Sequence, residues 1–416
     1  MKINKTSFYR TLFIVVLLAQ IYLPSFKINI FFQLGVLIIY FSLEKPIITV
    51  RLVKTITPLL AILFLGIIGL IFYRNPIGLA LKDIFHFIKP IQGILIGYFI
   101  FKTINDTRIF IKTIVTTALI SAIIHFLIIL LFVDIASGSI NAIRDFTKDN
   151  YLELMAIFFL GYYKFFFKQQ LYPSKTKTKI VFIILLLSSF LYFSRTMMAS
   201  AIIIALTIHG YTKITKTTMT ILAIFVIAIG SLYGYLYSVK IDRGKPGLEA
   251  FLYKIKIAPE EIFKTKIDRD NHKELWDHWR GYEAKRALAS MEDKPSSYIF
   301  GTGYGSLVNL KFKAPLSATD ERGLKFISEL HNGYPYVLYK TGILGLLLYL
   351  FFLVKLHLKI YAKFSFETSF ISAIGLFYLF TTMTITGVYN TNDTIIFVLG
   401  SLFYGLGTNK KVNSDD

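Results

Sequence analysis

One histidine stands where a long hydrophilic segment meets a hydrophobic one. His331 and Asn332 follow residues 239–330, the largest hydrophilic part of the chain, and directly precede an apolar run. An imidazole has an ordinary pKa of about 6.5, so it can accept a proton near neutral pH. His331 is therefore a candidate general base at a membrane surface. The alternative is that His331 and Asn332 only cap the helix that follows at the interface.

Two arginines could bind an anionic group near the same surface. Arg195 stands between two apolar runs with almost no loop between them, and an arginine inside such a hydrophobic hairpin is costly and usually functional. Its planar guanidinium can hold two phosphate oxygens at once, which favours binding over snorkelling to the headgroups. Arg280, followed on the next turn by Arg286, lies in the hydrophilic segment. The alternative there is an exposed amphipathic helix with ion pairs on its surface.

A glycine-rich stretch at residues 301–305 gives a weaker signal. It has the composition of a phosphate-binding loop, but the nucleotide fingerprint needs a strand before it and a helix after it, and that context is missing. A turn that returns the hydrophilic segment to the membrane is the favoured interpretation. Gly342 and Gly345, three residues apart in the next apolar run, are also typical of close helix packing.

Two more polar groups stand at the ends of apolar runs. Lys89, with His86 beside it, is either a buried charge or a side chain that snorkels to the headgroups, and the sequence leaves both open. Asn390, Asn392 and Asp393 could bind sugar hydroxyls, although a simple turn is the favoured interpretation.

The sequence does not predict a metal site. His272 and His278 are far from His331 in the chain, and nothing fixes the distance between them. The chain has no cysteine, which excludes disulfides, thiolate catalysis and cysteine-based metal sites.

The amino-acid composition indicates that these residues belong to a membrane protein. Of the 416 residues 55% are hydrophobic and only 17% are charged, whereas a soluble domain has about 45–50% apolar and about 25% charged residues. The net charge of +21 comes from 46 Lys+Arg against 25 Asp+Glu. It is spread over short loops, which is typical of the positive-inside rule and of attraction to anionic lipids and argues against nucleic-acid binding.

The apolar residues form blocks about 20 residues long, the length that crosses the hydrocarbon layer as a helix. The chain is therefore expected to be an all-α polytopic membrane protein, and a β-barrel is excluded because its strands alternate apolar and polar residues. The first block predicts a transmembrane helix rather than a removable signal peptide. About twelve spans are expected, near residues 9–24, 28–44, 56–73, 85–101, 113–133, 152–168, 179–194, 197–211, 219–238, 333–354, 367–388 and 393–408.

Lysine and arginine are concentrated in alternate loops between these spans. The rich loops are expected to be cytoplasmic, which places both termini inside and residues 239–330 outside. Helices lying on the membrane are expected in this segment, with amphipathic patches at 248–257 and 275–291. The chain then divides into N-terminal transmembrane helices (1–238), a periplasmic loop (239–330) and C-terminal transmembrane helices (331–416). No internal repeat indicates an inverted-repeat transporter.

Together these features resemble the O-antigen ligase and O-antigen polymerase superfamily. That family's signature is His, then Asn, Ser or Gln, nine residues, Gly, two residues, then Gly, Thr or Tyr. In this chain His331 and Asn332 are followed by nine residues, Gly342, two residues and Gly345. The order of features upstream is also similar: an arginine at the start of a span, an arginine early in the large outer loop, and a glycine-rich turn before the histidine.

The resemblance implies a membrane-embedded glycosyltransferase of the bacterial inner membrane, with its active site facing the periplasm. Such enzymes move a glycan from undecaprenyl pyrophosphate to an acceptor hydroxyl, and neither a cofactor nor a metal is expected. His331 would be the base, and Arg195 and Arg280 would bind the pyrophosphate and stabilise its negative charge. Direct displacement by the acceptor predicts inversion at the anomeric carbon. Possible supporting residues are Asn332, Arg286 and Lys89.

Two questions about function stay open at this stage. The acceptor is either another undecaprenyl-linked glycan, as in a polymerase, or a lipid A–core sugar, as in a ligase. The residues around Tyr334–Lys340 slightly favour the polymerase. The alternative from another class is a flippase or other transporter of lipid-linked glycans. Transport does not require a large outer loop that ends in the signature, whereas charged residues along several spans would favour it.

Overall fold

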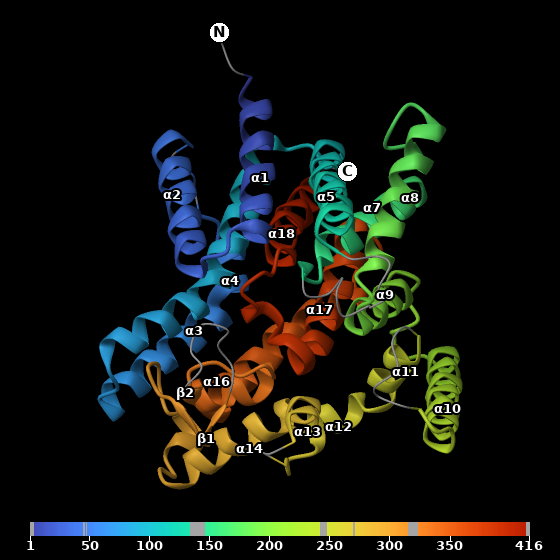
Figure 1. Ribbon diagram of the computed structural model, residues 1–416. Helices are drawn as coiled ribbons and strands as arrows, with labels where there is room; N and C mark the ends of the chain where they lie inside the picture. Colours follow the sequence, from blue (N-terminus) through green and yellow to red (C-terminus); the bar gives the residue numbers. More distant parts are fainter. Residues whose placement is uncertain are drawn as a thin grey trace.

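The computed structural model describes residues 4–44, 46, 48–133, 146–241, 248–268, 271–314 and 323–412. It is 78% helical and 3% strand, so the expected all-α class is confirmed (Figure 1).

The helices before residue 239 mostly begin at a capping side chain. Among these, Asn4, Thr49, Asp106, Ser194 and Thr215 each accept a hydrogen bond from a backbone N–H of the first turn, which satisfies a donor that the helix itself leaves unpaired. The helices are α1 (Lys5–Tyr22), α2 (Phe26–Glu44), α3 (Val50–Tyr73), α4 (Ile77–Ile104), α5 (Thr107–Phe132), α7 (Tyr151–Phe167), α8 (Lys175–Leu191), α9 (Arg195–Ile208) and α10 (Lys216–Ser238).

The C-terminal part consists of long helices joined by short 3₁₀ segments. These elements are α16 (Gly333–His357), η2 (Leu358–Tyr361), α17 (Phe366–Ile385), η3 (Gly387–Tyr389) and α18 (Ile395–Val412).

Each of the twelve expected spans is a helix in the structure. Seven helices in the described residues are long and apolar enough to cross a membrane, and α9 and α18 provide shorter apolar stretches. The protein is thus a multi-pass membrane protein. The orientation and the location of both termini stay predictions.

The segment between α10 and α16 is helical, as expected, but it also contains a β-hairpin. Its helices are α11 (Leu248–Lys256), α12 (Ala258–Phe263), α13 (His272–Asp277), α14 (Trp279–Glu292) and α15 (Ser297–Phe300).

The hairpin was not expected from the sequence. Strand β1 (Val308–Ala314) pairs antiparallel with β2 (Leu324–Ile327), with Val308 opposite Ile327. Apolar residues alternate with polar ones along β1, and the alternate residues Val308, Leu310 and Ala314 are buried. This period of two is the pattern of a half-buried strand.

Helices from the two halves of the chain pack together in the centre of the molecule. Figure 1 shows α17 and α18 between the N-terminal helices α1–α4 and the group α7–α9. Helix α18 packs on α4, and Ser401 Oγ donates to the carbonyl of Gly97 at 3.0 Å. By contrast, only Leu236 is buried within α10, all of whose residues are described.

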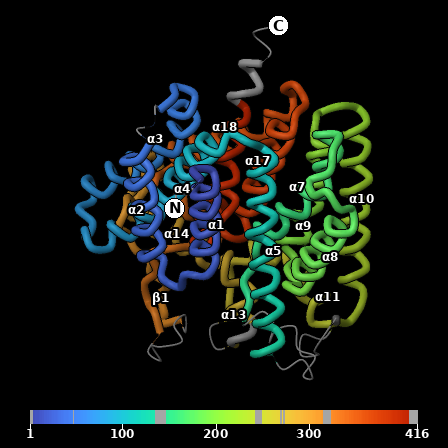
Figure 2. Tube along the Cα trace, turned by 90° about the horizontal axis from the view of Figure 1, so that it is seen from above, coloured from blue at the N-terminus to red at the C-terminus, as the bar shows by residue number. Residues whose placement is uncertain are grey.

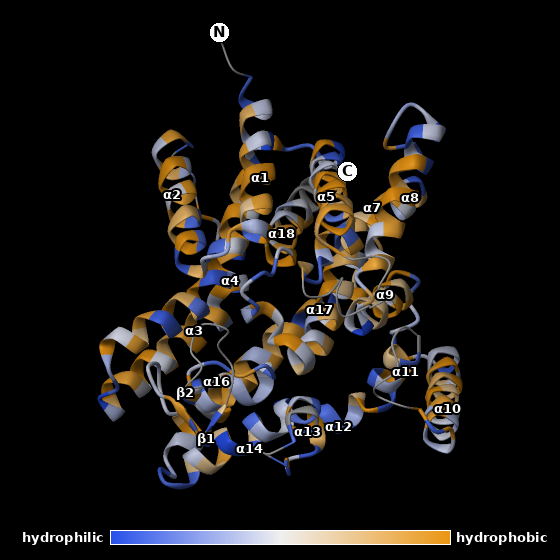
Figure 3. Ribbon diagram, viewed as in Figure 1, coloured by the Kyte–Doolittle hydropathy of each residue, from blue (hydrophilic) through white to orange (hydrophobic). Residues whose placement is uncertain are grey.

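The hydrophilic segment lies at one end of the helices. Figure 2 shows α11, α13 and β1 together toward one end of the helices. Figure 3 shows the same division by hydropathy, because α12–α14 carry many hydrophilic residues whereas α2, α8 and α10 are largely hydrophobic.

A break in α16 anchors the hydrophilic segment to the membrane helices. Gly342 has φ 69° and ψ −173° inside α16, a backbone conformation that glycine adopts readily. Near this break the carbonyls of Tyr339 and Lys340 accept from the N–H groups of Thr302 (2.7 Å) and Gly303 (3.1 Å). A Cβ on Gly342 would meet the backbone of Ile299. The glycine-rich turn and the signature glycine therefore pack directly against each other.

Candidate active site

His331 lies between β2 and α16 and is paired with a buried carboxylate. Its Nδ1 is 3.0 Å from both carboxylate oxygens of Glu283, and its backbone N–H donates to Glu283 Oε2 at 3.0 Å. The side chain of His331 is 59% exposed, whereas that of Glu283 is only 2% exposed. Within the described part of the chain no hydrogen bond reaches Nε2, so this nitrogen is the one that can accept a proton from a substrate.

The hydrogen bond that His331 donates to Glu283 raises the pKa of His331 above its ordinary value. Burial and the charge of Arg280 act in the opposite direction, while the charges of Glu283 and Glu329 add to the rise. A carboxylate at Nδ1 keeps the proton on that nitrogen and stabilises the imidazolium once Nε2 is protonated, as in histidine–carboxylate pairs of hydrolases. The pair therefore has the geometry of an oriented general base.

The two predicted binding arginines meet at a single carboxylate. Arg195 Nη2 is 3.0 Å from Glu261 Oε1, and Arg280 Nη1 is 2.8 Å from Glu261 Oε2. Arg195 also donates through Nη1 to the backbone carbonyl of Lys254. The structure thus brings together residues from α9, α12 and α14. The charge of Arg280 also lowers the pKa of His331, so this arginine is close enough to act on the histidine.

Local structure explains the position of each arginine. Ser194 caps α9 by accepting from the N–H of Met197 at 3.2 Å, and its hydroxyl donates to Asp149 at 2.7 Å. Arg195 is therefore held as the first residue of α9. On α14, a Cβ at position 281 would collide with the carbonyl of Lys264. Gly281 thus allows α14 to approach the end of α12, where Glu261 lies next to Arg280.

The three possible supporting residues do not join this cluster. Asn332 caps α16 by accepting from the N–H of Tyr334 at 3.1 Å, as the capping alternative predicts. Arg286 donates to the carbonyl of Asn309 in β1 at 2.9 Å. Lys89 is buried and donates to the carbonyls of Asn390 and Thr391 at 2.6 and 2.7 Å, so it holds the loop between η3 and α18.

The loop between η3 and α18, expected to be the last outer loop, is a turn, as favoured from the sequence. Asn390 Oδ1 accepts from the N–H of Asn392 at 2.8 Å, and Asp393 accepts from the N–H of Ile395 at 3.0 Å. This loop nevertheless borders a cavity of about 340 Å³ whose lining also includes Asp149.

A second carboxylate ties the segment before His331 to α4. Glu329 contacts Lys82 Nζ at 2.7 Å and His86 Nε2 at 3.1 Å. Although burial alone would raise the pKa of Glu329, His86 and Lys82 lower it to about 2. Deeper in the protein, the fully buried pair Lys340–Asp83 joins α16 to α4 at 2.5 Å. These ion pairs fix the backbone on both sides of His331.

Sequence reasoning missed Glu261, Glu283 and Glu329 as site residues. A signal existed only for Glu283, which lies three residues after Arg280 and therefore on the same face of a helix. Among the described side chains no group of three or more His, Cys, Asp or Glu could hold a metal ion. His278 contacts Lys264, and the side chain of His272 lies outside the described residues.

The comparison with family models agrees with this geometry. Residues 180–350 match the model of the O-antigen ligases. The matched region extends from α8 to α16 and includes Arg195, Glu261, Arg280, Glu283 and His331. A search of curated proteins found no match. Over residues 180–350 the chain is thus similar to the O-antigen ligases, in agreement with the resemblance to the O-antigen ligase and polymerase superfamily seen in the sequence.

Proposed function

We propose that this protein transfers a glycan from undecaprenyl pyrophosphate to an acceptor hydroxyl on the periplasmic face of the bacterial inner membrane. The observation that carries the proposal is the convergence of Arg195 and Arg280 on one carboxylate beside the His331–Glu283 pair. The family match supports a glycosyltransferase. The donor, the acceptor, the metal-free mechanism and the side of the membrane are parts of the proposal.

The arginine pair suits the leaving group of this reaction. When the glycosidic bond breaks, negative charge develops on the pyrophosphate, and preorganised guanidinium groups stabilise it. Glu261 contacts both Arg195 and Arg280, at the position where we expect that anion to bind. A pyrophosphate carries more charge and more acceptor oxygens than one carboxylate, so it can displace Glu261 from the pair.

The histidine pair suits the acceptor. A sugar hydroxyl is a weak nucleophile until a base removes its proton, and a positioned general base contributes about 10²–10⁴-fold in rate. Nε2 of His331 takes this proton, and Glu283 stabilises the resulting imidazolium. The acceptor oxygen then attacks the anomeric carbon as the pyrophosphate leaves from the opposite face, which gives inversion.

The cavity beside the last outer loop is a candidate site for sugar hydroxyls. Asp149 and Asn392 provide polar atoms in its lining, and Tyr151 provides an aromatic wall. Asp149 also accepts from Ser194, which directly precedes Arg195. We therefore assign part of the glycan to this cavity.

Glycan profiles from a deletion strain test the function and identify the acceptor. The strain is complemented with wild type, His331→Ala or His209→Ala at matched expression, and the lipid-linked and core-linked glycans are compared. His209 is an exposed histidine bonded to Tyr162, so its variant should behave like wild type. Loss of core glycan with long lipid-linked chains would identify a ligase, whereas single repeat units would identify a polymerase, which we slightly favour.

Two further outcomes test the mechanism. If His331→Ala restores the wild-type profile, the general-base mechanism is wrong and a transporter becomes the better hypothesis. Transfer by the purified protein is expected to persist in EDTA, because arginines rather than a metal stabilise the leaving group. Loss of activity in EDTA with recovery on adding a divalent cation would contradict this.

A further inference from the structure

A pocket at the end of the helices opposite His331 is lined by cationic and apolar side chains. It has a volume of about 700 Å³ and is formed by α3, α4, α16, α18 and the segment from η2 to α17. The cationic residues that line it are Arg51, Lys54, Lys355, Lys359 and Lys363. None of its seventeen described lining residues is acidic.

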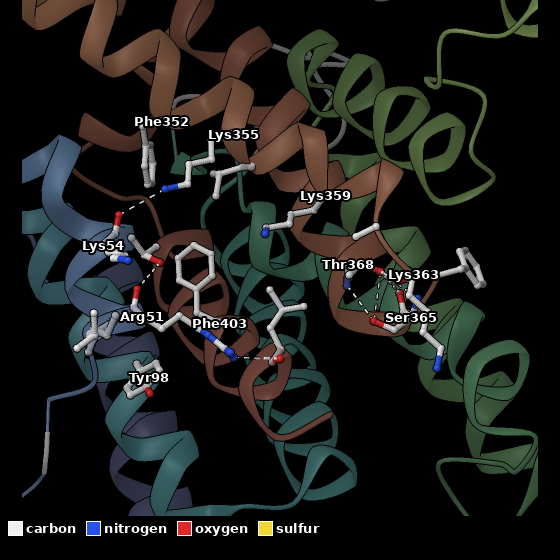
Figure 4. Close-up of a pocket in the computed structure, with 17 residues that line it drawn as sticks. Arg51, Lys54, Tyr98, Phe352, Lys355, Lys359, Lys363, Ser365, Thr368 and Phe403 are labelled. Atoms are coloured by element: carbon white, nitrogen blue, oxygen red, sulfur yellow. Dashed lines mark hydrogen bonds between the residues drawn. The ribbon is translucent and has the colours of Figure 1, made fainter. Parts of the chain in front are cut away.

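The cations come from two regions that are far apart in the sequence, the start of α3 and the stretch from the last turn of α16 to the residues just before α17. In Figure 4 the side chains of Arg51, Lys54 and Lys355 lie together on one side of the pocket, and Lys359 extends toward the pocket from another element. Lys355 Nζ donates to the backbone carbonyl of Lys54 at 3.5 Å, and Arg51 Nη1 donates to the carbonyl of Leu406 at 3.2 Å. These carbonyl partners position both side chains without neutralising their charges. The positive-inside rule explains why cations are frequent on one side of the membrane. It does not explain why cations from distant parts of the chain line the same pocket.

The rest of the pocket is apolar, and two helices begin at its edge. Phe352, Phe403 and Tyr98 form buried walls. Val50 is the first residue of α3, and Ser365 is the N-cap of α17; both line the pocket. The partial positive charge at the start of α3 favours an anion and adds to the side-chain charges, whereas α17 carries the acidic residue Glu367 in its first turn.

The pocket lies at the level where lipid headgroups are expected. Helix α16 begins at Gly333, next to His331, and reaches the pocket with Lys355 in its last turn. The part of α16 that follows its break at Gly342 is roughly 20 Å long up to Lys355 at about 1.5 Å per residue, so the pocket lies at the far end of an apolar helix, where headgroups border the hydrocarbon layer. Cationic pockets between transmembrane helices at this level bind anionic lipids.

We propose that this pocket binds an anionic phospholipid, with its phosphate among the cationic side chains and part of an acyl chain against Phe352 and Phe403. Charge complementarity and the combination of cationic and apolar walls identify the ligand class. The site is separate from the glycosyl-transfer residues, so it does not depend on the proposed function.

A tryptophan placed in the pocket can report this lipid directly. Phe364 lines the pocket and is exposed, and the native tryptophans Trp276 and Trp279 lie on α13 and α14 at the other end. The full-length Phe364→Trp protein is reconstituted in phosphatidylcholine, and fluorescence quenching by brominated phosphatidylglycerol or brominated phosphatidylcholine is measured. The parent protein gives the background. Brominated phosphatidylglycerol is expected to quench at a mole fraction at least about tenfold lower.

Neutralising the pocket tests the role of its charges. Arg51→Gln, Lys355→Gln and Lys359→Gln are combined in the Phe364→Trp background. Each cation near an anionic lipid contributes roughly fivefold to binding, so this variant should lose the preference for phosphatidylglycerol.

A control variant removes the same number of positive charges, three, from another cationic part of the chain. Lys175, Lys177 and Lys179 are exposed at the start of α8, and their combined change to Gln should leave the preference intact. An equal loss in both triple variants would indicate diffuse surface charge and overturn the proposal. So would equal quenching by the two brominated lipids in the unmodified background, or full reversal of the quenching by inorganic phosphate, which would indicate a site for free phosphate.

Discussion

The two ends of the helical bundle hold their cations in different ways. Near His331 the cationic groups contact carboxylates: Arg195 and Arg280 share Glu261, and His331 pairs with Glu283. At the opposite end five cations line one pocket without an acidic lining residue. A cation paired with a carboxylate can exchange it for a more highly charged anion and then release that anion. A cationic pocket whose described lining includes no acidic residue favours an anion that stays bound. The first arrangement suits an enzyme that binds and releases its substrate in each cycle. The second suits a lipid that stays bound.

The largest effect is expected from removing the guanidinium of Arg195 or Arg280, near His331. Arg280→Gln or Arg195→Gln should lower kcat for transfer about 10²–10³-fold, because loss of one preorganised donor to a developing negative charge costs this much. The measurement is transfer from a purified lipid-linked donor. Arg286→Gln on the same helix is the matched control, since Arg286 bonds only to the hairpin carbonyl of Asn309 among its described contacts. An equal loss in both variants would mean that α14 as a whole, rather than the pair at Glu261, is needed.

A smaller effect is expected from Glu283→Gln, which removes the charge beside His331. A hydrogen bond to a charged group is worth about 1.5–3 kcal/mol, so the plateau rate should fall roughly 10–100-fold. Because Glu283 raises the pKa of His331, the variant should also shift the acid limb of the pH–rate profile to lower pH. Glu292→Gln, an exposed change on the same helix, should leave the profile unchanged. An acid limb that does not move would exclude His331 as the group that titrates.

Gly342 lies at the break in α16, the helix that runs from His331 to the cationic pocket. Gly342→Ala should lower the free energy of unfolding by at least about 1–3 kcal/mol, the cost of a strained backbone conformation at a residue with a side chain. Its Cβ would also meet Ile299 and Gly301. Thermal unfolding in detergent measures the effect. Gly35→Ala is the control, since nothing lies within 4 Å of a Cβ on that residue of α2. Equal melting temperatures for the two variants would show that the contact with the glycine turn is dispensable.

Glu261→Gln removes the negative charge that Arg195 and Arg280 share. Without the competing carboxylate, the donor should bind a few-fold more tightly, in line with about 1 kcal/mol for a partly exposed ion pair. The readout is KM for the lipid-linked donor with kcat followed in parallel. A higher KM would indicate that Glu261 positions the arginines for the donor instead of competing with it.

Hydropathy alone was enough to locate the helices. Each expected span corresponds to a helix, because a membrane demands long uninterrupted apolar runs. The hairpin at β1 and β2 was missed because its alternation covers only a few residues and includes Lys311 and Lys313. His331 and Arg195 stood out because their types are unusual at the edges of apolar runs, whereas Arg280 stood out by its place early in the hydrophilic segment.

The carboxylate partners could not be predicted in the same way. Glu261 is 66 residues from Arg195, and Glu283 is 48 residues from His331. These contacts depend on how α12 and α14 fold back beneath α9 and α16, which a single sequence does not reveal. The cationic pocket shows the same limit, because Arg51 and Lys355 lie at the ends of helices that are far apart in the sequence, and each on its own resembles an ordinary cationic helix end.

The decisive experiment is single-turnover glycan transfer from a purified lipid-linked pyrophosphate donor, with wild type, His331→Ala and His209→Ala compared across pH. We expect His331→Ala to lose about 10²–10⁴-fold in rate together with the acid limb of the profile, while His209→Ala keeps both. A His331→Ala protein that transfers glycan at the wild-type rate and with the wild-type pH dependence would contradict a general-base role for His331.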